Sequence, residues 1–304
     1  MRWSLRTMLA RVPRFASDRL HSLVRSSTIL ANPFLSAKFV PLERRDVFDH
    51  VRIVVGRSVS ALNTDGDGLP VPPTELREGW GGKEATYLNT GRRDMERMLA
   101  TIEQADERPT ELRRVLDFGC ATGRLLRFYP RTAESECWGV DIKAKNIQWC
   151  QEHLSPPFLF ATTTTLPHLP FEDGYFDLVY CASVFTHIGD LPDATLLELR
   201  RILRPNGLIY ATVHDEHSVD ALFRDFEERD LTQQLRRIDE ATGVLHERYE
   251  FFYIGGEPWT QVFYDSSYLV QKWSRFMEVV SVTPEAMDYQ TALLLRKRPD
   301  SLGA

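Results

Sequence analysis

Most of what the sequence indicates about the fold comes from one stretch, Val115-Leu116-Asp117-Phe118-Gly119-Cys120-Ala121-Thr122-Gly123-Arg124. A short apolar segment leads into a loop with small residues at alternate positions, Gly119, Ala121 and Gly123. The following residues, 123–129, are predicted to form a helix. Glycines in such a loop let the backbone approach a ligand closely, because no Cβ stands in the way. The stretch is therefore typical of the first strand, loop and helix of a nucleotide-binding α/β fold.

A second acid follows the loop at a spacing that suits a ribose. Asp141 ends a predicted strand, 137–141, and comes eighteen residues after Gly123. The predicted ligand is not a dinucleotide. A dinucleotide-binding loop has the fingerprint G-x-G-x-x-G, which places a pyrophosphate on a helix N-terminus. Here Asp117 precedes the first glycine and would repel a pyrophosphate. The pattern favours a cationic, amino-acid-bearing ligand.

Two further motifs follow in chain order and extend the pattern. Residues 171–180 read Phe-Glu-Asp-Gly-Tyr-Phe-Asp-Leu-Val-Tyr, and residues 199–208 read Leu-Arg-Arg-Ile-Leu-Arg-Pro-Asn-Gly-Leu. Together with the glycine loop they resemble the class I S-adenosylmethionine-dependent methyltransferases over roughly residues 80–298. Ala121 stands where that family has its middle glycine. Asn206 replaces the first glycine of the turn into strand five, and asparagine tolerates positive φ better than most residues.

The order of predicted elements agrees with the resemblance. Predicted strands cover 114–118, 137–141, 158–161, 176–182 and 208–213, and predicted helices cover about 123–129, 143–153 and 192–203. This alternation predicts a parallel, doubly wound sheet with right-handed crossovers. After residue 213 come a charged, helical segment (215–250), a hairpin (251–263), a helix (266–276) and two strands (278–282 and 291–295). We expect an α/β, Rossmann-like sheet of seven strands whose last strand is antiparallel.

The chain divides into three predicted parts. Residues 1–80 form a partly helical N-terminal extension, and residues 81–298 form the methyltransferase domain. Within that domain, 215–264 is predicted to be an insertion on the acceptor side. A helix is predicted at about 86–104, and its entry, with Tyr87 and Gly91, resembles a bacterial subgroup often found alongside enzymes of glycans and secondary metabolites.

The resemblance assigns the cofactor contacts residue by residue. The floor under the methionine part of S-adenosylmethionine would be formed by Gly119, Cys120, Ala121 and Gly123, with Asp117 taking the ammonium group, Asp141 the ribose hydroxyls and Ile142 one face of the adenine. The alternatives are a tight turn without ligand for the loop, a helix cap for Asp117 and a strand-end acid for Asp141. Arg124 either contacts the ligand carboxylate or is a solvated residue of the first helical turn.

Strand three departs from the family pattern, because no acid follows it to bind the adenine amino group. The stretch after it is Ala161-Thr-Thr-Thr-Thr-Leu166, so Thr162 and Thr163 are predicted to substitute. Cys181 and Ser183 are placed where strand four opens toward the reacting methyl group.

Two histidines follow strand ends, where ligands bind in sheets of this kind. His187 comes after strand four and His214 after strand five. A hydroxyl acceptor must lose its proton on methylation, and histidine has a suitable pKa for accepting it. Both are candidate bases, and for both the alternative is a hydrogen-bonded residue behind the site. Aromatic residues of the insertion could line an acceptor pocket or belong to the core of their own hairpin: Tyr249, Tyr253, Trp259 and Tyr264.

Charge and cysteine usage limit the partners. The formal net charge of −6 argues against a nucleic-acid substrate, which usually requires a basic face. The four cysteines show no metal-ligand spacing, so no metal is expected and a cytoplasmic location with reduced thiols is favoured. No apolar run approaches the ~18 residues needed to span a membrane. Residues 1–17 carry four arginines and no acid, which suggests a packed helix, a peripheral membrane contact or a transit peptide.

The sequence therefore predicts a methyltransferase that uses S-adenosylmethionine and acts on an oxygen or nitrogen of a small molecule or glycan. Two alternatives stay open at this point. One is a partner subunit that binds S-adenosylmethionine without catalysis, and the other is a nicotinamide-dependent oxidoreductase on a similar sheet.

Overall fold

The computed structural model describes residues 68–80, 82–104, 112–189, 192–255 and 260–299. Most of the predicted N-terminal extension, including its arginine-rich start, lies outside these residues. Of the extension, the described part holds one short 3₁₀ turn, Thr74–Leu76. Among the helices of the described ranges, none has the length and apolar character required to cross a membrane.

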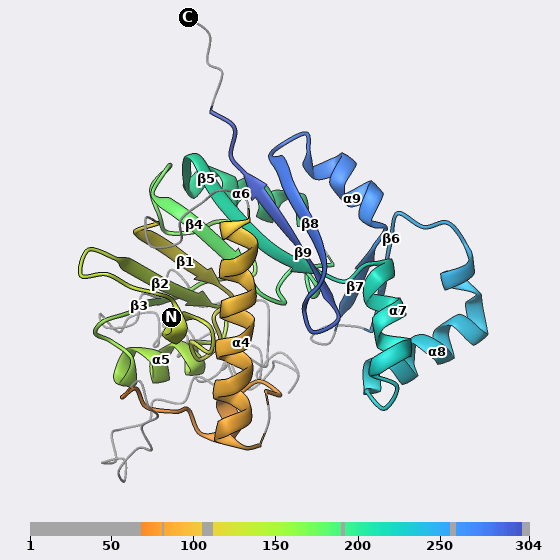
Figure 1. Cartoon of the computed structure of the whole chain (residues 1–304), viewed down its shortest axis with the longest axis horizontal. Coiled ribbons are helices and arrows are strands. Elements are labelled where there is room, and N and C mark those ends of the chain that lie inside the picture. Colours follow the sequence, from red (N-terminus) through yellow and green to blue (C-terminus); the bar gives the residue numbers. More distant parts are fainter. Residues whose placement is uncertain (1–67, 81, 105–111, 190–191, 256–259, 300–304) are drawn as a thin grey trace, which may run out of the picture.

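A seven-stranded mixed sheet forms the centre of the molecule (Figure 1). Its strands are β1 (Arg114–Phe118), β2 (Glu136–Asp141), β3 (Leu159–Thr162), β4 (Phe176–Cys181), β5 (Leu203–Val213), β8 (Glu278–Met287) and β9 (Gln290–Arg296). Their order is β3-β2-β1-β4-β5-β9-β8. Strands β1 to β5 are parallel, and β9 runs antiparallel to both β5 and β8. The predicted fold class is confirmed, including the antiparallel last strand.

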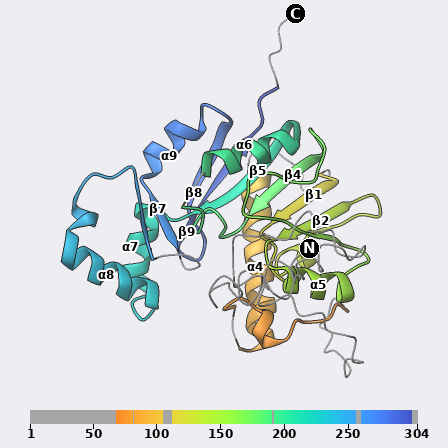
Figure 2. The same ribbon diagram turned by 180° about the vertical axis from the view of Figure 1, so that it is seen from behind.

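Helices cover both faces of this sheet, which explains why its strands are apolar on both sides. On one face α4 (Glu84–Glu103) and α5 (Ala144–His153) pack against Val115 and its neighbours. On the other face α6 (Pro192–Ile202) and α9 (Ser266–Trp273) pack against Leu116 and its neighbours (Figure 2). Consecutive residues of β1 thus enter opposite cores, as the twofold alternation of a strand requires.

The helix predicted at 123–129 is wrong. The structure has turns there and a short 3₁₀ segment, Leu126–Phe128, in which Phe128 N–H donates to Leu125 O and Tyr129 N–H to Leu126 O. Gly123 has a φ of +73°, so a right-handed helix cannot begin on it. Pro130 follows closely, which leaves fewer than two helical turns for the segment.

Strand five begins earlier than predicted, at Leu203 instead of residue 208. The strand continues through the turn motif because Asn206 adopts a φ of +64° and its N–H donates to Lys297 O. The asparagine thus takes the positive φ that the sequence analysis expected it to tolerate.

The insertion after β5 contains two helices and a hairpin. Its elements are α7 (Glu216–Asp225), α8 (Asp230–Thr242), β6 (Phe251–Ile254) and β7 (Gln261–Tyr264). Asp215 caps α7 by accepting the Ser218 N–H at 3.0 Å. The hairpin is tied to the end of β5 through a bridge between His214 and Phe263. Figures 1 and 2 show α7 and α8 beside the sheet, beyond β8 and β9.

Helix α4 lies very close to the loop after β1 at Gly91. A Cβ on Gly91 would lie 2.5 Å from the backbone oxygen of Arg124 and about 3 Å from its side chain. The Tyr87 hydroxyl, one turn earlier, bonds Thr122 Oγ1 at 3.0 Å. Tyr87 and Gly91 therefore dock the helix on the loop, which gives a physical reason for this pair in the sequence.

Replacing Gly91 by alanine is expected to destabilise the protein by about 1–3 kcal/mol, because a backbone oxygen stands where the methyl group must go. In an unobstructed helix the same change would stabilise by about 0.5–1 kcal/mol. Urea denaturation measures the difference, with Asn89→Ala on the exposed face of the same helix as the control. A stabilised Gly91→Ala variant would show that the helix does not dock this closely.

Candidate functional site

The loop after β1 is held against the end of β2 by its backbone. Gly119 N–H and Cys120 N–H both donate to Val140 O, at 2.8 and 3.0 Å. Gly119, Ala121 and Gly123 have φ values of +83°, +48° and +73°. All three small residues of the motif therefore adopt positive φ, which explains their alternate spacing. Ala121 takes this conformation with a Cβ, so glycine would be less strained there.

Asp141, at the end of β2, closes this loop from the other side. Its Oδ2 accepts the Ala121 N–H at 2.8 Å and its Oδ1 accepts the Lys143 N–H at 2.7 Å. Burial raises the pKa of Asp141, and the Lys143 and Ala121 amides oppose that shift. A carboxylate oxygen has two lone pairs, so Asp141 can hold the loop and still accept hydroxyl hydrogens.

Asp117 lies at the end of β1 and is 3% exposed. Burial raises its pKa from its ordinary value of 3.8 to about 8, against the opposing effects of Tyr180 and Arg124, while Asp141 adds to the increase. A buried acid of this kind is most stable as a carboxylate when a cation is next to it. A cation placed beside Asp117 would therefore favour its charged form, and its contact with the ligand ammonium stays a prediction.

Arg124 is buried, contrary to the expectation of a solvated residue. Its Nη1 lies 2.7 Å from Asp94 Oδ2, and the side chains of Arg124 and Asp94 are 5% and 0% exposed. Its guanidinium carbon lies 3.6 Å from the ring centre of Trp80. Because 123–129 is not a helix, Arg124 does not occupy an exposed first turn but points toward α4.

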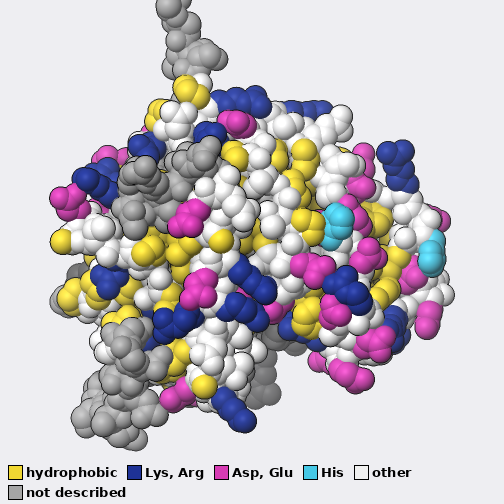
Figure 3. All heavy atoms as spheres, in the orientation of Figure 1, with side chains coloured by type: hydrophobic (Ala, Val, Ile, Leu, Met, Phe, Trp, Pro, Cys, Tyr) yellow, Lys and Arg dark blue, Asp and Glu magenta, His cyan; other side chains and the backbone are white. Residues whose placement is uncertain are grey.

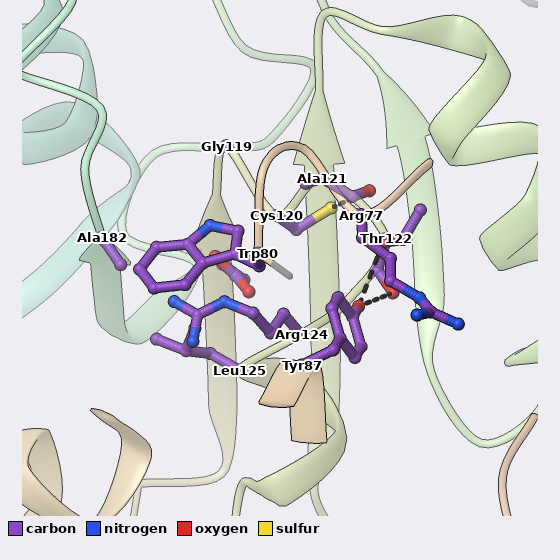
Figure 4. Close-up of a pocket in the computed structure, with 11 residues that line it drawn as sticks. Arg77, Trp80, Tyr87, Gly119, Cys120, Ala121, Thr122, Arg124, Leu125 and Ala182 are labelled. Atoms are coloured by element: carbon purple, nitrogen blue, oxygen red, sulfur yellow. Dashed lines mark hydrogen bonds between the residues drawn. The ribbon is translucent and has the colours of Figure 1, made fainter. Parts of the chain in front are cut away.

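These residues line a cavity together with a segment that precedes α4 (Figure 4). Its walls are formed by Arg77, Trp80, Tyr87, Asp117, Gly119, Cys120, Ala121, Thr122, Arg124, Leu125 and Ala182. The cavity is only about 40 Å³, and Figure 4 shows the Trp80 ring beside the Arg124 side chain in its wall. Sequence reasoning missed Arg77 and Trp80, because nothing in their local pattern connects them to a loop forty residues later.

The predicted adenine contacts lie at the ends of β2 and β3. Thr162 pairs with Asp141 across the two strands, and Thr163 N–H donates to Asp141 O at 2.9 Å. Thr163 is 1% exposed, while Ile142 and Thr162 are half-buried. The structure thus brings these residues together with Asp141, and their contact with adenine stays a prediction.

Cys181 and Ser183 lie at the end of β4. Cys181 is fully buried, so Ala182 and not Cys181 lines the cavity. Ser183 has a φ of +60°, and its N–H donates to Thr212 Oγ1 at 2.7 Å. Gln290 Nε2 donates to Ser183 Oγ at 3.0 Å, which fixes the start of the segment after β4.

His187 is exposed and is attached to the insertion. Its Nδ1 lies 2.8 Å from Thr260 O. A carbonyl oxygen can only accept, so Nδ1 carries the hydrogen and Nε2 is the basic nitrogen of the neutral ring. It lies between β4 and the hairpin, and its role as a base stays a prediction.

His214 is placed in the core, between the rings of Phe263 and Tyr289 at 4.8 and 5.4 Å. It is 1% exposed, and neither ring nitrogen has a hydrogen-bond partner among the described residues. Burial lowers its pKa from 6.5 to about 3, and His187 contributes in the same direction. Such a ring does not take up a proton at neutral pH, so the structure does not support His214 as a base.

His214 is expected to make stability depend on pH between about 3 and 6.5. The unfolded chain binds a proton there and the folded chain does not, so stability is present above pH 6.5 and is lost as the pH falls. Each unit below 6.5 costs at most about 1.4 kcal/mol. Urea denaturation at pH 7 and pH 5 tests this, because His214→Leu removes the titrating group and should lose less stability over that interval. An equal loss in both proteins would assign the effect to other groups.

The aromatic residues of the insertion differ in burial and in whether they line a cavity. Tyr264 is buried and lines a second cavity, whereas Tyr253 is 58% exposed and Trp259 lies outside the described residues.

One cluster of side chains has atoms of the kind that bind metal ions. These atoms lie within 4.8 Å of one another and belong to Asp215, Glu216 and His217. Asp215 caps α7, and Glu216 accepts the Ser266 N–H, so these acids have structural roles.

Comparisons with known proteins place the site in a recognised type of domain. Residues 116–211 match the family model described as "Methyltransferase domain". The ubiquinone/menaquinone biosynthesis C-methyltransferase UbiE of Cupriavidus pinatubonensis is 31% identical over 115 residues, which are 36% of this chain and 46% of that protein. The malonyl-[acyl-carrier protein] O-methyltransferase of Salmonella typhimurium is 32% identical over 109 residues, 36% of this chain and 41% of that protein. The chain thus spans less than half the length of either relative.

Among solved structures, a SAM-dependent methyltransferase from Aquifex aeolicus is similar at 14% identity, with a TM-score of 0.48. The match covers 75% of this chain and 99% of that one.

Proposed function

We propose that the chain transfers the methyl group of S-adenosylmethionine to an oxygen or nitrogen of a small molecule or glycan, and the match of residues 116–211 to a methyltransferase-domain model supports this. One observation carries the proposal: two buried carboxylates, Asp117 and Asp141, end adjacent parallel strands on either side of a loop with three positive φ values. This is the carboxyl edge of the sheet, where α/β folds bind ligands. The two acceptors suit a ligand with an ammonium group at one end and a ribose at the other.

In this proposal the residues hold the cofactor in order along the sheet edge. Asp117 pairs with the ammonium group above the floor formed by Gly119, Cys120, Ala121 and Gly123. Asp141 accepts the ribose hydroxyls, Ile142 packs on the adenine, and Thr162 or Thr163 meets its amino group. When bound, S-adenosylmethionine supplies an electrophilic methyl group. Because the cavity is only about 40 Å³, its walls must move apart for the cofactor to enter.

His187 is the proposed base. Methyl transfer to a hydroxyl would break the sulfur–methyl bond of S-adenosylmethionine, form an oxygen–carbon bond, leave S-adenosylhomocysteine and release the hydroxyl proton. A neutral imidazole is suited to take that proton. The hydrogen bond from Nδ1 to Thr260 O holds the tautomer in which Nε2 accepts. The relatives are named as a C-methyltransferase and an O-methyltransferase, so the preference for oxygen or nitrogen rests on His187 and not on them. On the face shown in Figure 3, basic and acidic side chains are interspersed, which favours a small acceptor over a nucleic acid.

Release of S-adenosylhomocysteine tests the proposal directly. The intact protein is incubated with S-adenosylmethionine and panels of phenols, amines and glycosides. We expect acceptor-dependent release that falls by about 10²–10⁴-fold in His187→Asn with cofactor binding unchanged. Binding without release on any panel would instead indicate a partner subunit, and binding of NADH in place of S-adenosylmethionine would indicate an oxidoreductase.

A further inference from the structure

A second cavity lies between the hairpin, α9 and the start of α6. It measures about 300 Å³, which is within the range of small-molecule sites. Its walls are formed by Gly189, Pro192, Asp193, Phe251, Val262, Tyr264, Tyr268, Leu269, Lys272 and Trp273. It shares no lining residue with the cofactor cavity. The segment after β4 joins the two, because Ala182 lines the first cavity and Gly189 the second.

Aromatic rings form much of this second cavity, and one of them is exposed. Phe251 is 45% exposed, although it is a large apolar side chain on a strand. Its ring is inclined by 28° to that of Tyr268, with 6.4 Å between the centres. Tyr264 and Trp273, in contrast, are 3% and 0% exposed. The cavity therefore has an aromatic mouth and a buried aromatic floor, which suits a ring-bearing ligand.

Two polar atoms of the floor residues have no hydrogen-bond partner among the described residues. They are the Tyr264 hydroxyl and Trp273 Nε1. An indole N–H only donates, and a phenol can donate, so both are completed by an acceptor oxygen. Buried donors of this kind usually have a partner, because leaving one unsatisfied is costly. Both residues line the cavity, but the two atoms are fully buried, so an oxygen of a ligand reaches them only when these side chains shift.

The charges at the cavity are already balanced. Lys272 Nζ lies 2.8 Å from Asp193 Oδ2 and donates to the Tyr268 hydroxyl at 3.0 Å. The same ammonium group lies 5.4 Å from the centre of the Tyr268 ring, at its hydroxyl edge. An anionic ligand would compete with Asp193 for Lys272. The lining therefore favours an uncharged ligand.

We propose that this cavity is a second ligand site, which binds an uncharged, planar ring compound bearing a hydrogen-bond-accepting oxygen. The site is separate from the cofactor cavity and does not depend on the proposed methyl transfer. The ring lies against Phe251 and Tyr268, and a shift of the floor side chains lets its oxygen accept from Tyr264 or Trp273.

Calorimetric titration of the intact chain with 1-naphthol tests the site. We expect saturable binding with a dissociation constant at or below about 1 mM. Phe251→Ala removes the exposed ring and should weaken binding about three- to tenfold. Tyr253→Ala is the matched control, because Tyr253 is an exposed aromatic of the same strand that does not line the cavity. Its affinity for 1-naphthol should equal that of the intact chain.

Three further measurements make the assignment specific. Tyr264→Phe keeps the ring and removes one floor donor, so it should weaken 1-naphthol binding without loss of folding. The anion 1-naphthoate should bind more weakly than 1-naphthol. Asp117→Asn should leave 1-naphthol binding unchanged, so a failure of the cofactor proposal would not affect this result.

Absence of saturable 1-naphthol binding to the intact chain would overturn the proposal. So would equal affinities in the intact chain, Phe251→Ala and Tyr264→Phe. Loss of binding in Asp117→Asn would place the probe in the cofactor cavity, and tighter binding of 1-naphthoate would contradict an uncharged ligand.

Discussion

Replacing Asp117 by asparagine is expected to weaken binding of S-adenosylmethionine by about 2–3 kcal/mol, on the order of a hundredfold. The change keeps the size of this buried side chain and removes the charge that would pair with the cofactor ammonium group. Titration calorimetry measures the affinity of both proteins. As a control, Asp173→Asn alters an exposed acid far along the chain and should leave the affinity unchanged.

The affinity of the intact protein should also depend on pH. Burial raises the pKa of Asp117 to about 8, so without a bound cation it holds a proton at pH 6.5. Pairing with an ammonium group favours the carboxylate, so binding releases that proton. Affinity should therefore increase by up to tenfold for each unit from about pH 6 to 8, and Asp117→Asn should lose this dependence. A flat profile for the intact protein would show that Asp117 does not ionise on binding.

The same residue links pH to folding in the opposite direction from His214. The folded chain holds the Asp117 proton up to about pH 8, while the unfolded chain releases it near 3.8. The folded state thus binds more protons in this interval, and the contribution of Asp117 to stability falls as the pH rises from about 4 to 8. The asparagine in the variant Asp117→Asn does not titrate. The stability of the variant relative to that of the intact protein should therefore increase from about pH 4 to pH 8.

Replacing Asp94 by alanine is expected to destabilise the fold by about 3–5 kcal/mol, because it leaves the buried Arg124 without its carboxylate. Asp94 also accepts from Arg93 at 2.9 Å, and Arg93 reaches Asp288 at 2.7 Å. The acid therefore joins the loop after β1 to α4 and to the turn between β8 and β9. Urea denaturation measures the loss.

An exposed ion pair provides the matched control for Asp94. Glu285 accepts from Arg224 at 2.9 Å, and their side chains are 44% and 54% exposed. Glu285→Ala should cost at most about 1 kcal/mol, since exposed pairs contribute little. If Asp94→Ala and Glu285→Ala lose equal stability, the Arg124–Asp94 pair is not buried as described.

The sheet could be predicted because its signals are local. Strands of a doubly wound sheet are short apolar segments, and β1, β2 and β4 were placed within a residue or two at each end. The small residues of the loop also indicate its backbone conformation, because few residue types tolerate positive φ. Asp117 and Asp141 follow from their positions at strand ends, which the sequence displays directly.

The contacts between residues that are far apart in the sequence could not be predicted. Arg124 reads as a surface residue beside a polar stretch, and only the packing of α4 shows that Asp94 neutralises it in the core. His214 follows a strand end like a ligand-binding residue, but the insertion folds back and covers it with Phe263. Trp80 lies in a segment with no periodicity. It lines the cavity because the chain before α4 packs next to the loop after β1.

The central claim is that the loop from Gly119 to Gly123, with Asp117 and Asp141, binds S-adenosylmethionine. The most direct measurement is calorimetric titration of the intact protein with S-adenosylmethionine and, separately, with NADH. Asp141→Ala is less informative, because the Asp141 carboxylate also holds the Ala121 amide and its loss would disturb the loop. We predict saturable binding of S-adenosylmethionine that is strongly weakened in Asp117→Asn, and no binding of NADH. Absence of S-adenosylmethionine binding, or tight NADH binding, would contradict the account.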